Sequence, residues 1–284
     1  MPAVIFAVLV AGFALVAAVA GAVPARPAAL PPGGAFERPL NMAADDVTVD
    51  NTGTGLIARG HVRVTYGADV ATADLLHLTK ASRTAELSGH VLISDPQGKA
   101  SGETVVLYVT PDNRIARVVM RGNAAVEGRE YALSADVIDA DRTGGRVVAE
   151  GHVNAFSAPD LIATGGRMTY DQRTQHAVLS GHPVISNKVG RIEGGWMELF
   201  RAERRGVIHG PVAADVYGAT ITGAGAAVDF KTSVAVFTGH VVMTRRQGTL
   251  WADRVTVYYN ARRIRAGGTT RAHFNDLGDG GTPP

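Results

Sequence analysis

Repeat glycines, several of them in a Gly-His-Val motif, recur along the chain with nearly constant spacing. Counted from Gly60, successive copies are 29, 33, 29, 30, 29, 29 and 29 residues apart. Such regular spacing is typical of a repeat protein, in which each copy forms one supersecondary unit. The repeat glycines are Gly60, Gly89, Gly122, Gly151, Gly181, Gly210, Gly239 and Gly268.

A second small residue precedes each repeat glycine, by 16 residues in all copies except that of Gly122, where the separation is 20. These small residues are Ala44, Ala73, Gly102, Ala135, Gly165, Gly194, Gly223 and Ala252. An acidic residue often follows them, at Asp45, Asp74, Glu103, Asp136 and Asp253. The chain therefore holds about eight copies of one 29-residue unit.

Within a unit, apolar residues alternate with polar ones. Val62 and Val64 alternate with His61 and Arg63, and the pattern returns in later copies. Short alternating segments bounded by glycine and other turn residues predict half-buried strands. With strands of about five to six residues, eight units would hold roughly 16 to 24 strands. Since one unit cannot bury its own apolar face, the units must stack, which predicts an all-β, elongated repetitive roll.

The ends of the chain differ from the repeats. Residues 3–23 carry no charge, and a segment rich in proline and glycine follows. We predict a cleaved signal peptide over residues 1–25, with an inner-membrane anchor helix formed by residues 3–23 as the alternative. Residues 26–42 are predicted to form a linker and residues 273–284 a disordered tail. The β region is expected over residues 43–272, as one body or as two tandem halves, 43–150 and 151–272.

Composition excludes several classes of function. The chain has no cysteine, which rules out disulfides, thiolate metal sites and cysteine nucleophiles. A formal net charge of +2 gives no indication of nucleic-acid binding. No P-loop, Gly-x-Ser-x-Gly or His-Glu-x-x-His motif occurs. We therefore expect no enzymatic activity, no cofactor and no metal site.

The segment from Asp45 to Val64 resembles the OstA-like repeat of the LptA–LptC family of lipopolysaccharide-transport periplasmic proteins. It reads Asp-Asp-Val-Thr-Val, then Gly-Leu-Ile-Ala-Arg-Gly-His-Val-Arg-Val, and similar sequences recur through residue 268. The resemblance implies a periplasmic β-jellyroll, folded like a taco, that holds lipid A acyl chains on its inner apolar face. It further implies edge-strand addition between rolls, with itself or with other Lpt components. Such a bridge would join an inner-membrane ABC transporter to an outer-membrane translocon.

The apolar phase of the alternation is the predicted lipid-binding site. Burying an acyl chain stabilises the complex by about 0.8 kcal/mol per CH₂, and a uniform apolar trough provides this without desolvating polar groups. The alternative is that the same residues only fill a closed core. The predicted lipid-binding residues are Val62, Val64, Leu76, Leu78, Val91, Ile93, Val105, Leu107, Ile138, Val153, Met168, Tyr170, Met197, Leu199, Val241, Met243, Val255 and Val257.

Three sets of polar residues have ordinary structural interpretations. The recurrent histidines His61, His90, His152, His182 and His240 are expected at turns or on the solvent face, because successive copies lie too far apart to share a metal ion. The recurrent acids are expected to be structural, because catalytic carboxylates form a unique pair. Solvated turns account for the basic clusters, although contact with lipid phosphates is an alternative: Arg201, Arg204 and Arg205, Arg245 and Arg246, and Arg262, Arg263 and Arg265.

The leading hypothesis is a periplasmic protein that binds lipopolysaccharide and carries it from the inner to the outer membrane. Two alternatives remain open. One is a structural β-solenoid of the cell envelope. The other is a β-helix enzyme acting on polysaccharide, which would require one repeat to break the pattern with a cluster of acidic or basic residues.

Overall fold

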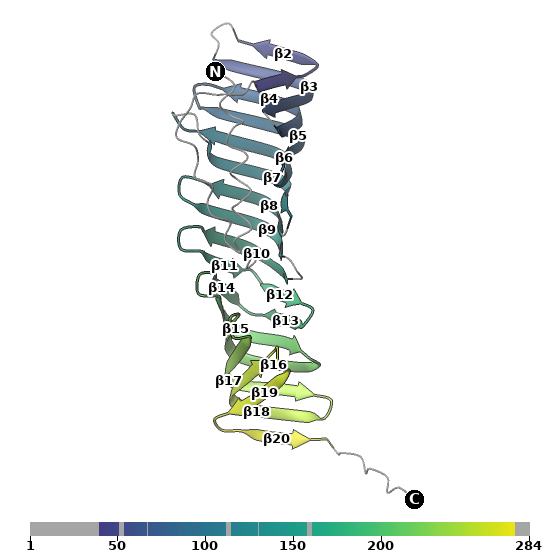
Figure 1. Ribbon diagram of the computed structural model, residues 1–284, viewed down its shortest axis with the longest axis vertical. Coiled ribbons are helices and arrows are strands. Elements are labelled where there is room, and N and C mark those ends of the chain that lie inside the picture. Colours follow the sequence, from purple (N-terminus) through teal and green to yellow (C-terminus); the bar gives the residue numbers. More distant parts are fainter. Residues whose placement is uncertain are drawn as a thin grey trace, which may run out of the picture. The chain divides into compact units, whose positions relative to one another are not determined.

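A computed structural model of the chain describes residues 40–50, 54–66, 68–111, 115–129, 131–157 and 161–275. These residues form antiparallel strands joined by turns, and no helix occurs among them (Figure 1). The prediction of an all-β fold is confirmed. The predicted signal peptide or anchor, and the residues of the tail beyond Asn275, lie outside the described ranges. No helix within those ranges has the length and hydropathy needed to span a membrane.

The chain divides into two compact units, the first comprising residues 1–159 and 167–175, and the second residues 160–166 and 176–284. Unit 1 holds β1 (Leu40–Ala43), β2 (Asp46–Val49), β3 (Gly55–Tyr66), β4 (Asp69–Thr79), β5 (Thr84–Asp95), β6 (Gly98–Val109), β7 (Ile115–Gly128), β8 (Tyr131–Asp141) and β9 (Arg146–Ser157). The unit boundary falls within β10 (Leu161–Asp171). Unit 2 holds β11 (His176–Ser180), β12 (Val184–Asn187), β13 (Gly190–Glu193), β14 (Trp196–Phe200), β15 (Arg205–Val216), β16 (Ala219–Asp229), β17 (Val234–Arg245), β18 (Gly248–Tyr258), β19 (Arg263–Gly267) and β20 (Arg271–Phe274).

Each unit is a meander in which a strand pairs with the next one along the chain. In unit 1 this holds from β3 to β9, and in unit 2 from β15 to β18 (Figure 1). Asp side chains stabilise several hairpin turns. The Asp229 carboxylate, for example, accepts hydrogen bonds from the backbone N–H groups of Lys231 and Thr232 at 2.8 and 2.9 Å.

Six of the eight repeat glycines lie within strands, so the expectation that they end short strands was wrong for these six, whereas Gly181 and Gly268 lie at breaks between short strands. Between β3 and β4, Arg59 pairs with Leu75 and Val62 with Ala73, so two residues of β3 face one residue of β4. The two residues that face Asp74, Gly60 and His61, have φ values of 73° and 44°. This is a β-bulge, which bends a strand without ending it. Glycine adopts positive φ freely, and histidine is one of the few other residues enriched there.

Because the bulge keeps the ladder continuous, the uninterrupted strands are 11 to 14 residues long rather than five or six. Four other strand positions are split at the bulge into two short segments, namely β1/β2, β11/β12, β13/β14 and β19/β20. Pro183 lies at one of these breaks and has no N–H to donate to the ladder. The described residues thus contain sixteen strand positions, two for each of the eight repeats.

Candidate functional site: an apolar pocket in unit 2

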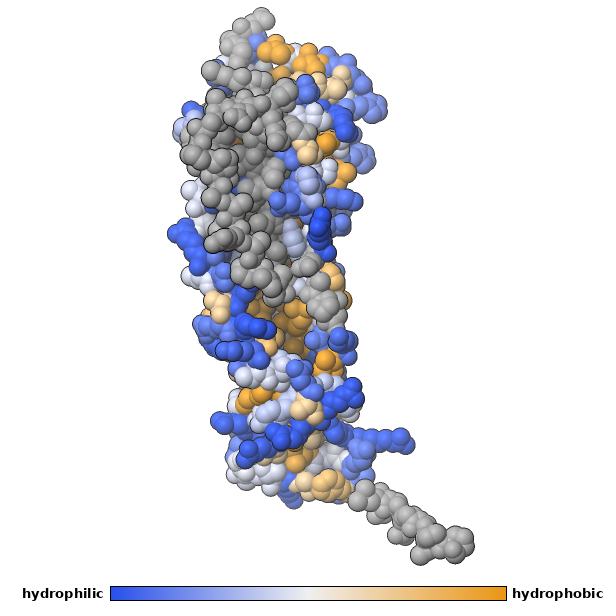
Figure 2. All heavy atoms as spheres, in the orientation of Figure 1, coloured by the Kyte–Doolittle hydropathy of each residue, from blue (hydrophilic) through white to orange (hydrophobic). Residues whose placement is uncertain are grey.

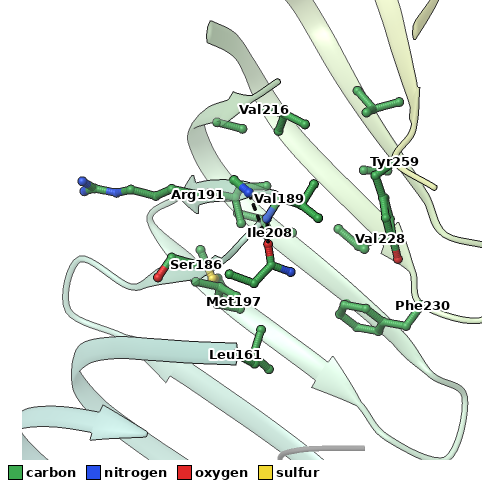
Figure 3. A pocket seen from close by; sticks show the side chains of 18 of the residues that line it. Leu161, Ser186, Val189, Arg191, Met197, Ile208, Val216, Val228, Phe230 and Tyr259 are labelled. Atoms are coloured by element: carbon green, nitrogen blue, oxygen red, sulfur yellow. Dashed lines mark hydrogen bonds between the residues drawn. The ribbon is translucent and has the colours of Figure 1, made fainter. Parts of the chain in front are cut away.

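A cavity of about 150 Å³ opens within unit 2. Its wall is mainly aliphatic and aromatic, and Figure 3 shows Leu161, Met197 and Ile208 around the same space, with Phe230 and Tyr259 across from them. The Arg191 side chain points away from that space. The lining residues are Leu161, Ile185, Ser186, Asn187, Val189, Gly190, Arg191, Ile192, Met197, Glu198, Leu199, Gly206, Val207, Ile208, Ala214, Val216, Val228, Phe230, Ala235, Phe237, Val257 and Tyr259.

A row of inward side chains crosses the sheet beside this pocket. Met197 of β14 pairs with Ile208 of β15, and Ile208 pairs with Ala226 of β16. Ala226 in turn pairs with Phe237 of β17. Ile208 and Phe237 are 4% and 1% exposed, so this row forms the floor of the pocket rather than a solvent face.

The two rims of the unit 2 sheet meet across the pocket. Tyr217 follows the end of β15, and Tyr259 follows the end of β18, which runs in the opposite direction. The Tyr217 hydroxyl donates a hydrogen bond to the backbone carbonyl of Tyr259. The Arg262 guanidinium lies 5.7 Å from the centre of the Tyr217 ring. We call these three residues the rim bridge.

The rim bridge shows that the unit 2 sheet folds over on itself. An 11-residue strand such as β16 extends about 36 Å. The residues at opposite ends of these strands can touch only if the sheet bends between them, and the bulges lie at that bend. The pocket therefore lies between two flanks of one folded sheet, as the predicted open roll requires.

The polar groups near the pocket have partners. Glu198 alternates with the inward residues of β14, and its carboxylate accepts hydrogen bonds from His176 and His209 at 3.1 and 3.0 Å. Trp196 stacks on His209 with ring centres 3.8 Å apart. Burial raises the pKa of the Tyr259 hydroxyl, which donates to the Asp229 carbonyl at 3.3 Å. The charge of Glu198 is thus taken up by histidines instead of facing the apolar space.

Most of the predicted lipid-binding residues are buried. Fifteen of the eighteen fall in this class, whereas Leu78, Leu199 and Met243 are partly exposed. Only Met197, Leu199 and Val257 line the cavity. The structure therefore brings three of the predicted residues together around one space, and lipid contact by all eighteen stays a prediction.

The sequence reasoning missed most of the pocket, including Ile208 and Phe237. A repeat signal marks both, because each lies two residues before a repeat glycine. The same position is buried in five of the six other copies, at Ala58, Leu87, Met120, Ala149 and Leu179. The prediction included only positions that follow a repeat glycine or the second small residue of a unit. The residues preceding it carry the same inward phase because the strand continues through the bulge.

The recurrent histidines and acids turn out to be partners. His61 Nδ1 lies 2.8 Å from an Asp45 oxygen, and His90 Nδ1 lies 2.8 Å from an Asp74 oxygen. His152 and Asp136 pair in the same way at 3.0 Å. All three imidazoles are 91% exposed, as expected for the solvent face. Among the described residues, no group of three or more His, Asp or Glu is arranged to hold a metal ion.

The basic clusters occupy hairpin turns and the strand ends beside them. Arg205 lies over the Phe200 ring at 4.2 Å and pairs with Glu203 at 2.9 Å. Arg263 lies over the Tyr258 ring at 4.5 Å. Figure 2 shows hydrophilic residues interspersed with hydrophobic ones on this face of unit 2. These contacts agree with a solvated surface role and leave phosphate contact as a prediction.

Comparison with known proteins gives a family match over part of the chain. Residues 220–281 match the family model described as LptA/(LptD N-terminal domain) LPS transport protein. The match covers β16 to β20, which supply one flank of the pocket, and it confirms the repeat resemblance for this part of the chain. No curated protein matches the chain. A solved structure with similarity is LptH, the LptA-homologous periplasmic component of the conserved lipopolysaccharide transport device from Pseudomonas aeruginosa, with 17% identity and a TM-score of 0.33 over 51% of this chain and 85% of that one.

Proposed function

We propose that this protein is a periplasmic component of lipopolysaccharide transport that binds lipid acyl chains between the flanks of its folded β sheet. The observation that carries the proposal is the apolar pocket of unit 2, formed in part by the segment that matches the LPS-transport family model. Apolar lining with few polar groups is what an acyl chain requires, because each buried CH₂ contributes about 0.8 kcal/mol. The proposal includes no catalytic step.

The charge of unit 2 supports an anionic lipid. Residues 176–275 carry thirteen Lys and Arg against six Asp and Glu, a formal net charge of +7. Residues 40–175 carry thirteen basic and seventeen acidic residues, a formal net charge of −4. A positive surface around an apolar pocket attracts ligands that combine hydrocarbon tails with phosphate groups. Lipid A belongs to this class.

The proposal extends to partners and location. The first and last described strand positions are sheet edges: β2, like β1, pairs with β3, and β20 pairs with β18. Both strands are exposed, and Phe274 of β20 is 70% exposed. Unpaired edges accept strands from other rolls. We therefore assign edge-strand addition to further Lpt-type rolls, between an inner-membrane ABC transporter and an outer-membrane translocon, as part of the proposed function.

Site-specific photo-crosslinking tests this proposal. A photoreactive amino acid is placed at Leu199, which lines the pocket, and in a matched control at Val178 on the neighbouring strand β11. Val178 pairs with Glu198, so it belongs to the opposite phase from Leu199 while being similarly part-exposed. We expect lipopolysaccharide to crosslink at Leu199 and not at Val178.

Substitution of the pocket floor provides a second readout. Ile208→Asp should reduce crosslinking at Leu199 by at least about tenfold, because the carboxylate would remain unpaired in an apolar space. Circular dichroism establishes that the variant remains folded. Equal crosslinking at Leu199 and Val178, or none at either, would reject lipid binding by this pocket and favour the structural solenoid.

A further inference from the structure

The rim bridge bounds one end of the apolar pocket. Val216 and Tyr259 line the pocket, and Tyr217, the residue after Val216, donates its hydroxyl hydrogen to the Tyr259 carbonyl. Leu161 lines the pocket at the far end from Val216 (Figure 3). A ligand that extends past Val216 therefore meets the Tyr217 side chain.

The closed pocket is small for a lipid tail. An apolar cavity of about 150 Å³ accommodates a ligand of roughly the size of benzene. The pocket here has the same volume, about 150 Å³. A linear acyl chain of lipid length is several times larger than a benzene ring. Such a chain fits unit 2 only if it extends beyond the present wall.

The backbone at Tyr217 marks this residue as unusual. Tyr217 and Gly218 form the two-residue turn between β15 and β16, with φ values of 51° and 73°. Turns with two positive φ values favour Asn, Asp or Gly, and a tyrosine at the first position is strained. Twelve described non-glycine residues have positive φ, and such an outlier is a reason to ask what contacts its side chain makes. The contacts that the side chain makes are the hydrogen bond to Tyr259 and the Arg262 guanidinium over its ring.

The two halves of the rim bridge differ in how firmly they are held. The Tyr259 hydroxyl donates a hydrogen bond to the carbonyl of Asp229, which holds that residue to its own rim. Tyr217 is 36% exposed, and one hydrogen bond and one contact between its ring and an Arg guanidinium connect it to the opposite rim. Opening therefore requires rotation of the Tyr217 side chain alone.

We infer that Tyr217 determines the length of hydrocarbon that unit 2 admits: short tails bind with the rim bridge closed, and long tails require Tyr217 to swing away. The inference rests on the proposed function, because it concerns the same pocket. It identifies Tyr217 as a specificity-determining residue. The Tyr259 carbonyl accepts its hydrogen bond, and the Arg262 guanidinium lies over its ring.

Binding kinetics of two matched probes test the inference on the full chain. The probes are hexanoic and tetradecanoic acid amides that carry the same environment-sensitive fluorophore. Tyr217→Asn removes the ring and the bridge while giving the turn its preferred Asn-Gly sequence, so folding is not put at risk. Tyr217→Phe keeps the ring and removes only the hydrogen bond. Stopped-flow fluorescence gives the association rate of each probe.

We expect Tyr217→Asn to raise the association rate of the tetradecanoyl probe about tenfold and Tyr217→Phe to raise it about threefold, as loss of both contacts or of one predicts. The hexanoyl probe should bind all proteins within about twofold of one another, because it does not reach the bridge. Tyr108→Ala is the matched control. Tyr108 is also 36% exposed and has Arg117 at 5.7 Å, but the two lie on neighbouring strands β6 and β7.

The outcomes separate the inference from the proposed function. If both probes bind and neither Tyr217 variant changes the tetradecanoyl rate, the role of Tyr217 is overturned and lipid binding stands. A change of equal size in the tetradecanoyl rate of Tyr108→Ala also overturns the role of Tyr217, since the effect would then not depend on the rim bridge. If the unaltered chain binds neither probe, the proposed function fails, and the role of Tyr217 fails with it.

Discussion

The bulges of the two units share one backbone conformation but differ in what lies against it. In unit 1 every repeat glycine faces a carboxylate: Gly60 faces Asp45, Gly89 faces Asp74, Gly122 faces Glu103 and Gly151 faces Asp136. In unit 2 three successive glycines face small residues instead: Gly181 faces Gly166, Gly210 faces Gly195 and Gly239 faces Ala224. The glycine φ values are 73° to 75° in unit 1 and 75° to 83° in these three. The glycine therefore sets the bulge, and the carboxylate is an addition to it.

Three of the four carboxylates of unit 1, at Asp45, Asp74 and Asp136, connect neighbouring strands through the exposed histidines. Unit 2 lacks this link where its ladder is least regular, at the breaks between β11 and β12 and between β13 and β14. The pocket is lined by residues from these same strands. We call a carboxylate that faces a repeat glycine, together with its histidine partner, a clamp. The comparison suggests that unit 1 is a regular stack held by clamps and that unit 2 is a binding region that lacks them at three successive repeat glycines. Three tests follow from this difference.

The largest effect is expected from alanine at a clamped bulge. In Gly89→Ala, a Cβ atom would meet Asp74 Oδ2 at 2.2 Å, and the φ of 75° is strained for alanine. Left-handed strain costs about 1–2 kcal/mol, and displacement of Asp74 adds to it, so we expect a loss of about 3 kcal/mol. Urea denaturation followed by circular dichroism measures the loss.

Gly210→Ala is the unclamped counterpart. Its Cβ atom would lie 3.3 Å from the nearest atom, the Cα of Gly195, so strain is the main penalty and a loss of about 1–2 kcal/mol is expected. Equal losses for Gly89→Ala and Gly210→Ala would show that the carboxylate is irrelevant to the packing at the bulge.

A smaller effect is expected from transplanting the clamp. Ala224→Asp places a carboxylate against Gly239 and beside His240, as Asp74 lies beside His90 in unit 1. Exposed ion pairs of this kind stabilise by about 0.2–1 kcal/mol. Below pH 6 we therefore expect the free energy of unfolding to rise by an amount within that range, which urea denaturation measures as a higher midpoint. The control is Ala227→Asp on the same strand, which adds the same charge opposite Val207 and Val236. Equal midpoints for the two variants would exclude the clamp.

The smallest effect concerns pH. The hydrogen bond from His61 to Asp45, with the charge of Asp45, raises the pKa of His61 above its ordinary 6.5. Because the folded-state pKa is the higher one, this pair stabilises the fold fully below about pH 6.5 and loses its effect as pH rises through the raised pKa. Proton NMR titration of the His61 ring should give a lower pKa in Asp45→Asn than in the unaltered chain. An unchanged titration would contradict the pairing.

Much of the fold was predictable from the spacing of a few residues. The alternation at Val62 and Val64 indicates strands, and the 29-residue period fixes how many units there are. The pairing of His90 with Asp74 was accessible too, because the two lie at equal distances from the turn around Ser82 and meet across an antiparallel hairpin. Strand length was misjudged because glycine signals both turns and bulges, and local sequence does not distinguish them.

The pocket was less predictable because its wall depends on how far the sheet bends. Met197 and Val257 share the inward phase with many residues that do not line this cavity, such as Val105 and Ile138, which are 0% and 1% exposed. Alternation assigns a side chain to a face and does not specify the distance to the opposite flank. That distance is a property of the whole folded sheet.

The sequence by itself determined the elements of this protein: strands from period-two alternation, bulges from glycines that tolerate positive φ, and stacked units from the 29-residue repeat. These are local properties, fixed by sterics and by the direction in which successive side chains point. Only the tertiary structure decided that Tyr217 meets Tyr259 and that an apolar space opens beside them. Those contacts join residues three strands apart at opposite rims, and they form only when the bend of every intervening strand has brought the two rims together.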